Sequence, residues 1–265
     1  MPRRTKLIAA LALCVCVFLI CAGVITVRLV SEYKSDQLNE SLRALAGIPA
    51  ETEVTAAAGE AGDGLSASAS PYTALYEMNQ DFTGWLSIPG TSIDYPVMQT
   101  PDDPEYYIDK DFNGDRDANG TLFLDGRCTP ESGNLIVYGH NMKSGRMFGT
   151  LEEYENEAYY REHPKIRFDT LAKQGTYEII AVFISQVYPK DSDEFKFYVY
   201  TEFPTREAFD AFIYNIKAVS LYDTGVEAGY GDSLLTLTTC EYLRDNGRFV
   251  VVARKQGLTD LEAGT

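Results

Sequence analysis

The chain has 265 residues, enough for one ordinary domain with additional segments or for two small domains. Its 23 Lys and Arg against 39 Asp and Glu leave a formal net charge of -16, which argues against nucleic-acid binding because that binding depends on neutralising phosphates. With 45% apolar and 12% aromatic residues, the chain can bury a core, so global disorder is excluded and β structure is favoured.

An uncharged, mostly apolar run occupies residues 7–27 and follows three basic residues, Arg3, Arg4 and Lys6. About twenty apolar helical residues cross the hydrocarbon core of a bilayer. The basic residues favour a cytoplasmic N-terminus, residues 1–6, with the rest of the chain outside. A cleaved signal peptide is the alternative, but its apolar region is normally only about 7–15 residues and ends at a small-residue site. The sequence therefore predicts an uncleaved, single-pass anchor.

Between the anchor and the folded domain we expect an extracellular stalk and linker over residues 28–71. Its first part, Ser31 to Leu45, has leucines at helical spacing and fits either a continued polar helix or a solvated stalk. Residues 46–71 are rich in Ala, Gly, Ser and Glu, which is typical of a flexible spacer. The domain proper is predicted at 72–256, followed by a tail at 257–265.

Short strand-like runs separated by turn residues fill most of the predicted domain. They are residues 85–88, 93–97, 121–124, 134–138, 165–168, 177–187, 233–239 and 248–255. The segment from Thr205 to Leu221 differs, because its apolar residues recur at helical spacing and predict an amphipathic helix with Thr205 as N-cap. Strands do not alternate regularly with helices, which disfavours a parallel α/β sheet. The pattern predicts a mainly β fold, a β-barrel with helical decoration.

Two cysteines, Cys128 and Cys240, lie in the predicted domain, and three lie in the apolar run. The two could form one disulfide, although two cysteines do not make a disulfide framework. The alternative is a free extracellular thiol, which is often a nucleophile. The turn signal Asn246-Gly247 lies between Cys240 and Arg248, and residues on either side of a hairpin turn lie opposite each other, so the two side chains are expected to be neighbours. An adjacent cation lowers a thiol pKa. An unreactive buried Cys240 beside a solvated Arg248 is the other interpretation.

The chain has only two histidines. His140 follows the run 134–138 after one glycine, a suitable position for a cleft, and cysteine nucleophiles usually need a histidine as acid and base. A capping or core role for His140 is the alternative, and His163 is interpreted as structural. No pair of His or Cys stands at ligand spacing, and the acidic turn at 111–117 lacks the glutamate of a calcium loop, so no metal site is predicted.

Three motifs together resemble the sortases, the membrane-anchored cysteine transpeptidases of Gram-positive bacteria. They are Tyr138-Gly139-His140-Asn141-Met142, Thr236-Leu237-Thr238-Thr239-Cys240 and Gly247-Arg248-Phe249-Val250-Val251, in the order of that family. The stretch from Trp85 to Gln99 and the helix before the cysteine strand resemble class B, and the likeness covers about residues 72–256. Thr238 departs from the class, whose members often have Ser at that position, and this bears on hydrogen bonding near the nucleophile.

The resemblance implies an eight-stranded sortase β-barrel with an N-terminal helix and a helix inserted before the cysteine strand. It implies one groove lined by three catalytic residues, His140, Cys240 and Arg248. It also implies substrate contacts from Thr238, Thr239, Tyr242 and Asn141. No cofactor and no metal are expected.

By the same resemblance, the enzyme cleaves the C-terminal sorting signal of a secreted protein, of the Asn-Pro-x-Thr-x or Pro-x-Thr-Gly type, after its Thr. Cys240 attacks the Thr carbonyl, and an amine from a cell-wall precursor or a pilin lysine resolves the thioacyl enzyme. His140 would exchange protons with both amines, and Arg248 would hold the peptide carbonyl or the oxyanion. A cysteine peptidase that releases product to water and a non-catalytic surface or pilus-assembly module are the alternatives.

The anchor and the spacer lead to one prediction. The full chain should fractionate with membranes, and external protease should cut within residues 46–71 and release an active domain. Membrane fractionation and mass spectrometry of the released fragment check this. Recovery from the culture medium of a mature chain that begins beyond residue 20 would show instead that the apolar run is removed.

Overall fold

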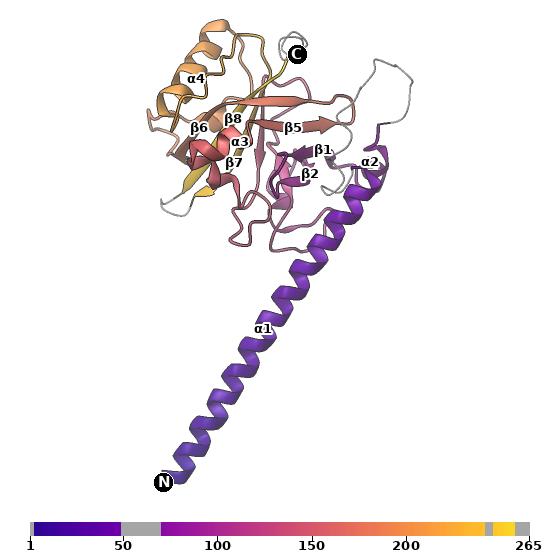
Figure 1. The fold of residues 1–265 in the computed structure, drawn as a ribbon, viewed down its shortest axis with the longest axis vertical. Coiled ribbons are helices and arrows are strands. Elements are labelled where there is room, and N and C mark those ends of the chain that lie inside the picture. The colour runs from indigo at the N-terminus through magenta and orange to yellow at the C-terminus, as the bar shows by residue number, and fades with distance from the viewer. Residues whose placement is uncertain (1–2, 49–69, 242–245, 258–265) are drawn as a thin grey trace. The chain divides into compact units, whose positions relative to one another are not determined.

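The computed structural model describes residues 3–48, 70–241 and 246–257, which form two compact units, Met1–Ser41 and Leu42–Thr265 (Figure 1). The first unit is helical: α1 (Arg3–Leu45) runs through it and into the second unit. The helix therefore continues through Ser31 to Leu45, in agreement with the first of the two interpretations of this segment, a continued helix. Within α1, the stretch Leu11–Leu45 is long and apolar enough to cross a membrane, with a mean hydropathy of 2.7 in its most apolar part.

Eight strands of the second unit close into a barrel in the order β1-β2-β3-β4-β7-β8-β6-β5. They are β1 (Phe82–Ser87), β2 (Asp94–Met98), β3 (Leu122–Leu124), β4 (Asn134–Tyr138), β5 (Lys165–Thr170), β6 (Thr176–Gln186), β7 (Leu234–Glu241) and β8 (Gly247–Lys255). Each strand coincides with a predicted run, and the expected eight-stranded barrel is confirmed. Closure leaves no unpaired sheet edge within the barrel.

Two neighbouring pairs in the barrel are parallel, β2 with β3 and β4 with β7. The second pair determines the layout of the molecule, because it aligns Tyr138 near the end of β4 with Thr238 near the end of β7. Parallel strands run in the same direction, so the residues that follow β4 and the last residues of β7 emerge at the same end of the barrel. The local strand patterns did not predict this pairing.

Helices and short 3-10 turns cover the outside of the barrel (Figure 1). The helices are α2 (Thr73–Met78), α3 (Glu157–Glu162) and α4 (Arg206–Val219), and the turns are η2 (Tyr106–Asp109), η3 (Leu151–Glu155) and η4 (Phe197–Val199). The expected helix before the cysteine strand is α4. The Thr205 hydroxyl accepts a hydrogen bond from the backbone N–H of Ala208 at 3.2 Å, which confirms the predicted N-cap.

The apolar residues form one core inside the barrel and a second between the barrel wall and α4. In β8, Val251 packs into the barrel interior, whereas Val250 and Val252 pack into the second core with Phe212 of α4. Because successive strand residues point to opposite faces, a strand buried on both faces is apolar at nearly every position. Burial on both faces holds β8 firmly, and β8 carries Arg248 near its first residue.

A buried side-chain hydrogen bond also joins the parallel strands β4 and β7. Asn134 is fully buried; its amide donates to the Tyr200 carbonyl at 2.8 Å, and its Oδ1 accepts from the Thr236 hydroxyl at 2.9 Å. Removing the hydroxyl would leave a buried carbonyl oxygen with one partner fewer, and unsatisfied buried polar groups are costly.

We therefore expect Thr236→Val, which keeps the side-chain shape, to lower the free energy of unfolding by about 1–3 kcal/mol. Chemical denaturation measures this. Thr176→Val is the matched control, because Thr176 lies in β6 and makes no side-chain hydrogen bond within the described residues. Its effect should stay below about 0.5 kcal/mol. Equal losses in the two variants would contradict a stabilising role for the Asn134–Thr236 bond.

Candidate active site

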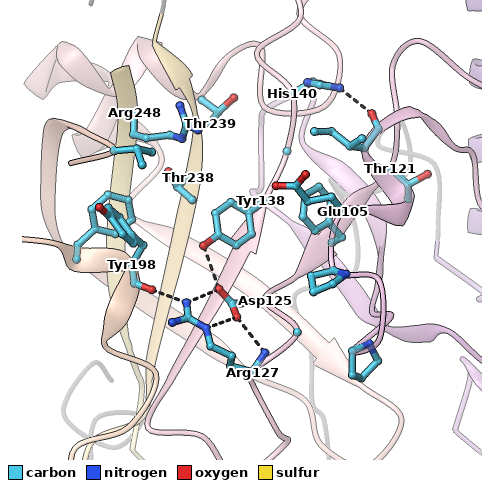
Figure 2. Close-up of a pocket in the computed structure, with 18 residues that line it drawn as sticks. Glu105, Thr121, Asp125, Arg127, Tyr138, His140, Tyr198, Thr238, Thr239 and Arg248 are labelled. Atoms are coloured by element: carbon cyan, nitrogen blue, oxygen red, sulfur yellow. Dashed lines mark hydrogen bonds and ion pairs between the residues drawn. The ribbon is translucent and has the colours of Figure 1, made fainter. Parts of the chain in front are cut away.

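An open cavity of about 530 Å³ lies where β4 and β7 end (Figure 2). Its walls come from parts of the chain that are far apart in sequence. The segment after β2 contributes Pro101, Pro104, Glu105 and Ile108, and the region around β3 contributes Thr121, Phe123, Asp125, Gly126 and Arg127. The rest of the lining is Tyr138, Gly139 and His140 at the end of β4, Val187, Phe197 and Tyr198 after β6, and Thr238, Thr239 and Arg248 from β7 and β8.

The hairpin of β7 and β8 brings the predicted nucleophile and its cation into register. Cys240 pairs with Arg248 across the two strands, as predicted for residues on either side of one turn, and Gly247 itself pairs with Glu241 and so lies in β8. Asn246 adopts a positive φ of 55°, a conformation that Asn tolerates better than most residues. Arg248 lines the cavity and donates from Nη1 to the Gly247 carbonyl at 2.8 Å. The Cys240 side chain and Tyr242 lie outside the described residues.

His140 reaches the same cavity from the end of β4. Gly139 precedes it and has no room for a side chain, because a Cβ there would collide with Leu122 and Phe148. The imidazole Nε2 lies 2.7 Å from the Ile108 carbonyl oxygen. Figure 2 shows His140 and Arg248 on opposite sides of the cavity. The structure thus brings these two predicted residues to one groove, with space between them.

Two buried hydroxyls in the cavity have no hydrogen-bond partner among the described residues, those of Thr238 and Thr239. The two residues are 0% and 2% exposed. Buried polar groups are nearly always hydrogen-bonded, so an unpaired pair calls for an explanation. Both residues line the cavity, but their hydroxyl oxygens are shielded from solvent. Their predicted contact with substrate stays a prediction.

The polar network at the far end of the cavity was not predicted from the sequence. Asp125, at the end of β3, accepts from Arg127 Nε at 2.9 Å and Nη2 at 2.7 Å, and from the Tyr138 hydroxyl at 3.0 Å. Arg127 also donates to the Tyr198 carbonyl at 2.6 Å (Figure 2). One sequence signal could have indicated this network: an Asp that directly follows a buried strand and stands two residues before an Arg.

Charge compensation keeps this network in one protonation state. Burial by itself would raise the pKa of Asp125, but hydrogen bonds and charge from Arg127 outweigh burial and hold that pKa below its usual value. Burial, followed by the Asp125 carboxylate, raises the pKa of Tyr138 well above its usual value. Asp125 therefore stays ionised and Tyr138 stays a donor at neutral pH, so the end of the cavity is rigid and charge-balanced.

Two further residues singled out in the sequence do not line the cavity. Asn141 is buried and donates from its amide to Glu152 Oε1 at 2.5 Å, and its predicted substrate contact stays a prediction. His163 places Nδ1 at 2.9 Å from the Pro89 carbonyl oxygen and packs against Tyr159. These contacts fit the structural interpretation of His163.

Cys128 is a free, buried thiol whose Sγ lies 3.5 Å from the Asn134 carbonyl oxygen. Burial raises its pKa to about 11. Because the thiolate is the reactive form, such a thiol is a poor nucleophile at neutral pH. This agrees with the prediction that Cys128 is not the nucleophile.

Comparison with known proteins gives one consistent result. Residues 86–256 match the family model described as the sortase domain. Sortase B of Listeria monocytogenes is 34% identical over 181 residues, which cover 67% of this chain and 70% of that protein. Sortase B of Staphylococcus aureus is 31% identical over 187 residues, 69% of this chain and 73% of that protein. The crystal structure of sortase B from B. anthracis in complex with AAEK1 superposes with a TM-score of 0.70 at 27% identity, covering 86% of this chain and 98% of that chain.

The burial of Cys128 leads to a prediction. Cys128→Ser should keep well over a tenth of the wild-type turnover of a peptide substrate, because the hydroxyl can still donate to Asn134 and a lost packing contact costs only about 0.5–3 kcal/mol of stability. Cys240→Ser is the comparison and should lose turnover. A folded Cys128→Ser with less than about a tenth of wild-type turnover would contradict the assignment of Cys240 as the nucleophile.

Proposed function

The chain belongs to the sortase family as a class B cysteine transpeptidase, and we propose that Cys240, His140 and Arg248 perform its reaction on the C-terminal sorting signal of a secreted protein. Sortases act on sorting-signal peptides and amine nucleophiles. One observation carries the residue assignment: the parallel pairing of β4 with β7 delivers the residue after β4 and the end of β7 to the same cavity.

Cys240 is the proposed nucleophile. Its backbone pairs directly with Arg248, and directly opposed residues have Cβ atoms only about 4.5–5.5 Å apart. A guanidinium next to a thiol favours the thiolate over the thiol. The thiolate attacks the carbonyl carbon of the signal's threonine, the C–N bond breaks, and the carboxyl-terminal remainder leaves as an amine. The product is a thioacyl enzyme, which an incoming amine resolves.

His140 is the proposed acid and base. It lies across the cavity from Arg248, so a peptide bound between them would face both groups (Figure 2). A protonated imidazole donates to the leaving amine, and the neutral imidazole then accepts a proton from the incoming amine. One group thus serves both halves of the reaction in turn.

Arg248 is the proposed oxyanion donor. Within the described residues its guanidinium bonds only to the backbone carbonyls of Asn246 and Gly247, through Nη1. The remaining donors of its planar fork are therefore available to the developing oxyanion. Thr238, Thr239, Asn141 and Tyr242 are the proposed substrate contacts, and the first two line the cavity.

The cavity suits an extended peptide that contains proline, since several of its walls are apolar. Pro101, Pro104, Ile108, Phe123 and Phe197 line it. We propose a signal of the Asn-Pro-x-Thr-x or Pro-x-Thr-Gly type and an acceptor amine from a cell-wall precursor or a pilin lysine. The apolar part of α1 would anchor the chain in the cell membrane, with a cytoplasmic N-terminus and the catalytic domain outside.

These roles predict different defects in three variants. Cys240→Ala should abolish cleavage and transpeptidation, because it removes the nucleophile. His140→Ala should remove nearly all turnover, because neither amine can exchange its proton. Arg248→Lys keeps the charge but loses the planar fork, so turnover should fall by about 10²–10³. Cys240 should still react with a small alkylating agent in the last two variants, which separates nucleophile loss from loss of proton transfer or oxyanion binding.

Mass spectrometry tests the intermediate directly. The enzyme mixed with a sorting-signal peptide and no added amine should carry a thioacyl group on Cys240 in the wild type and none in Cys240→Ala. Adding an amine nucleophile should discharge the adduct into a ligated peptide. An adduct that maps to Cys128, or unchanged cleavage by Cys240→Ala, would overturn the proposed mechanism.

A further inference from the structure

The hydrogen bond from His140 to the main chain determines which ring nitrogen carries a proton. Nε2 lies 2.7 Å from the Ile108 carbonyl oxygen. A carbonyl oxygen only accepts, so Nε2 must be the donor, in the neutral ring as well as in the charged one. Nδ1 has no hydrogen-bond partner among the residues that the structure describes. The free nitrogen of the neutral ring is therefore Nδ1.

We propose that the Ile108 carbonyl is a positioning group that holds His140 as the Nε2–H tautomer, so that Nδ1 exchanges protons with the leaving and incoming amines. This inference rests on the proposed function, because it assumes that His140 is the acid and base. In the charged ring, Nδ1–H protonates the scissile nitrogen as the C–N bond breaks, and a neutral ring with Nε2–H remains. Nδ1 then takes a proton from the incoming amine as that nitrogen attacks the thioester and the Cys240 thiolate leaves.

Hydrogen bonds on both sides of Ile108 hold the backbone that carries this carbonyl group. The Ile108 N–H donates to the Glu105 carbonyl at 3.0 Å within η2, and the Thr121 N–H donates to the Tyr107 carbonyl at 3.0 Å. The Thr121 hydroxyl also donates to the Lys110 carbonyl at 2.8 Å. The start of β3 therefore holds η2 on both sides of Ile108, which keeps the carbonyl oxygen in place.

Gly120 packs directly against the Ile108 carbonyl oxygen. Its φ is +62°, in the left-handed region that side chains rarely adopt, and a Cβ there would collide with the carbonyl oxygen of Ile108. An alanine at this position therefore pushes on the oxygen atom that orients His140. It does so without replacing either His140 or a residue of the cavity wall.

The second histidine supplies an internal reference. His163 places Nδ1, not Nε2, at 2.9 Å from a carbonyl oxygen, that of Pro89. By the same reasoning its neutral ring is the Nδ1–H tautomer. The chain has only two histidines, so one spectrum of the histidine rings should contain both tautomers, one from each residue.

The first experiment is ¹⁵N–¹H correlation of the imidazole rings in the full chain, labelled with ¹⁵N-histidine, in detergent and at a pH where both rings are neutral. His163→Gln assigns the signals. We expect His140 to show the Nε2–H pattern and His163 the Nδ1–H pattern. A His140 ring with Nδ1–H, or with comparable amounts of both tautomers, would overturn the inference.

The second experiment perturbs the carbonyl. Gly120→Ala should mix the His140 tautomers and lower kcat by about 10², the scale of a misplaced catalytic group, with KM within about twofold of wild type. Alkylation of Cys240 should be unchanged. Gly90→Ala is the matched control, because Gly90 has a φ of +77° and its Cβ would lie 2.9 Å from Cε1 of His163. It should disturb the His163 signals and leave kcat within about twofold of wild type.

Thr121→Val covers the case in which Gly120→Ala does not fold, because it removes only the hydroxyl bond to Lys110. It should shift the His140 tautomers and kcat in the same direction by a smaller factor. Wild-type kcat in folded Gly120→Ala or Thr121→Val, with His140→Ala inactive, would contradict the positioning role alone. Full activity in His140→Ala would instead contradict the proposed function.

Discussion

The parallel pairing of β4 with β7 is the constraint on which the rest of the structure depends. Five consecutive residue pairs join the strands, from Asn134 with Leu234 to Tyr138 with Thr238. A slip by one residue would turn every side chain of β7 to the other face, and each residue of slip moves the strand by about 3.3 Å. The buried bond between Asn134 and Thr236 opposes such a slip. His140 and the end of β7, with Thr238 and Thr239, therefore meet at one cavity because of this register.

The position of Arg248 depends in the same way on β8, the hairpin partner of β7. Because β8 is buried by the barrel interior on one side and by α4 on the other, its backbone has little freedom near the cavity. The helix α4 lines no part of the cavity, yet its packing on the barrel wall supports the strand that carries the arginine. Packed strands thus carry Cys240 and Arg248, the two residues that the proposed mechanism places side by side.

The two arginines of the cavity differ in what surrounds them. Arg127 forms a paired, hydrogen-bonded unit with Asp125, so its charge is compensated. Arg248 bonds only to backbone carbonyls within the described part of the chain. In a chain that is strongly acidic, Arg248 places a positive charge opposite Cys240, where the proposed mechanism develops negative charge on a thiolate and an oxyanion.

The sequence by itself determined the local elements and the chemistry of the motifs. Period-two runs marked the strands, helical spacing and Thr205 marked α4, and the turn signal between Cys240 and Arg248 marked the hairpin in which they pair. Only the tertiary structure decided the parallel β4–β7 pairing, the Asp125–Arg127 unit bonded to Tyr198, and the bond of His140 to the Ile108 carbonyl. These contacts depend on which loops meet after the barrel has closed, and no periodicity along the chain encodes the distance between two loops.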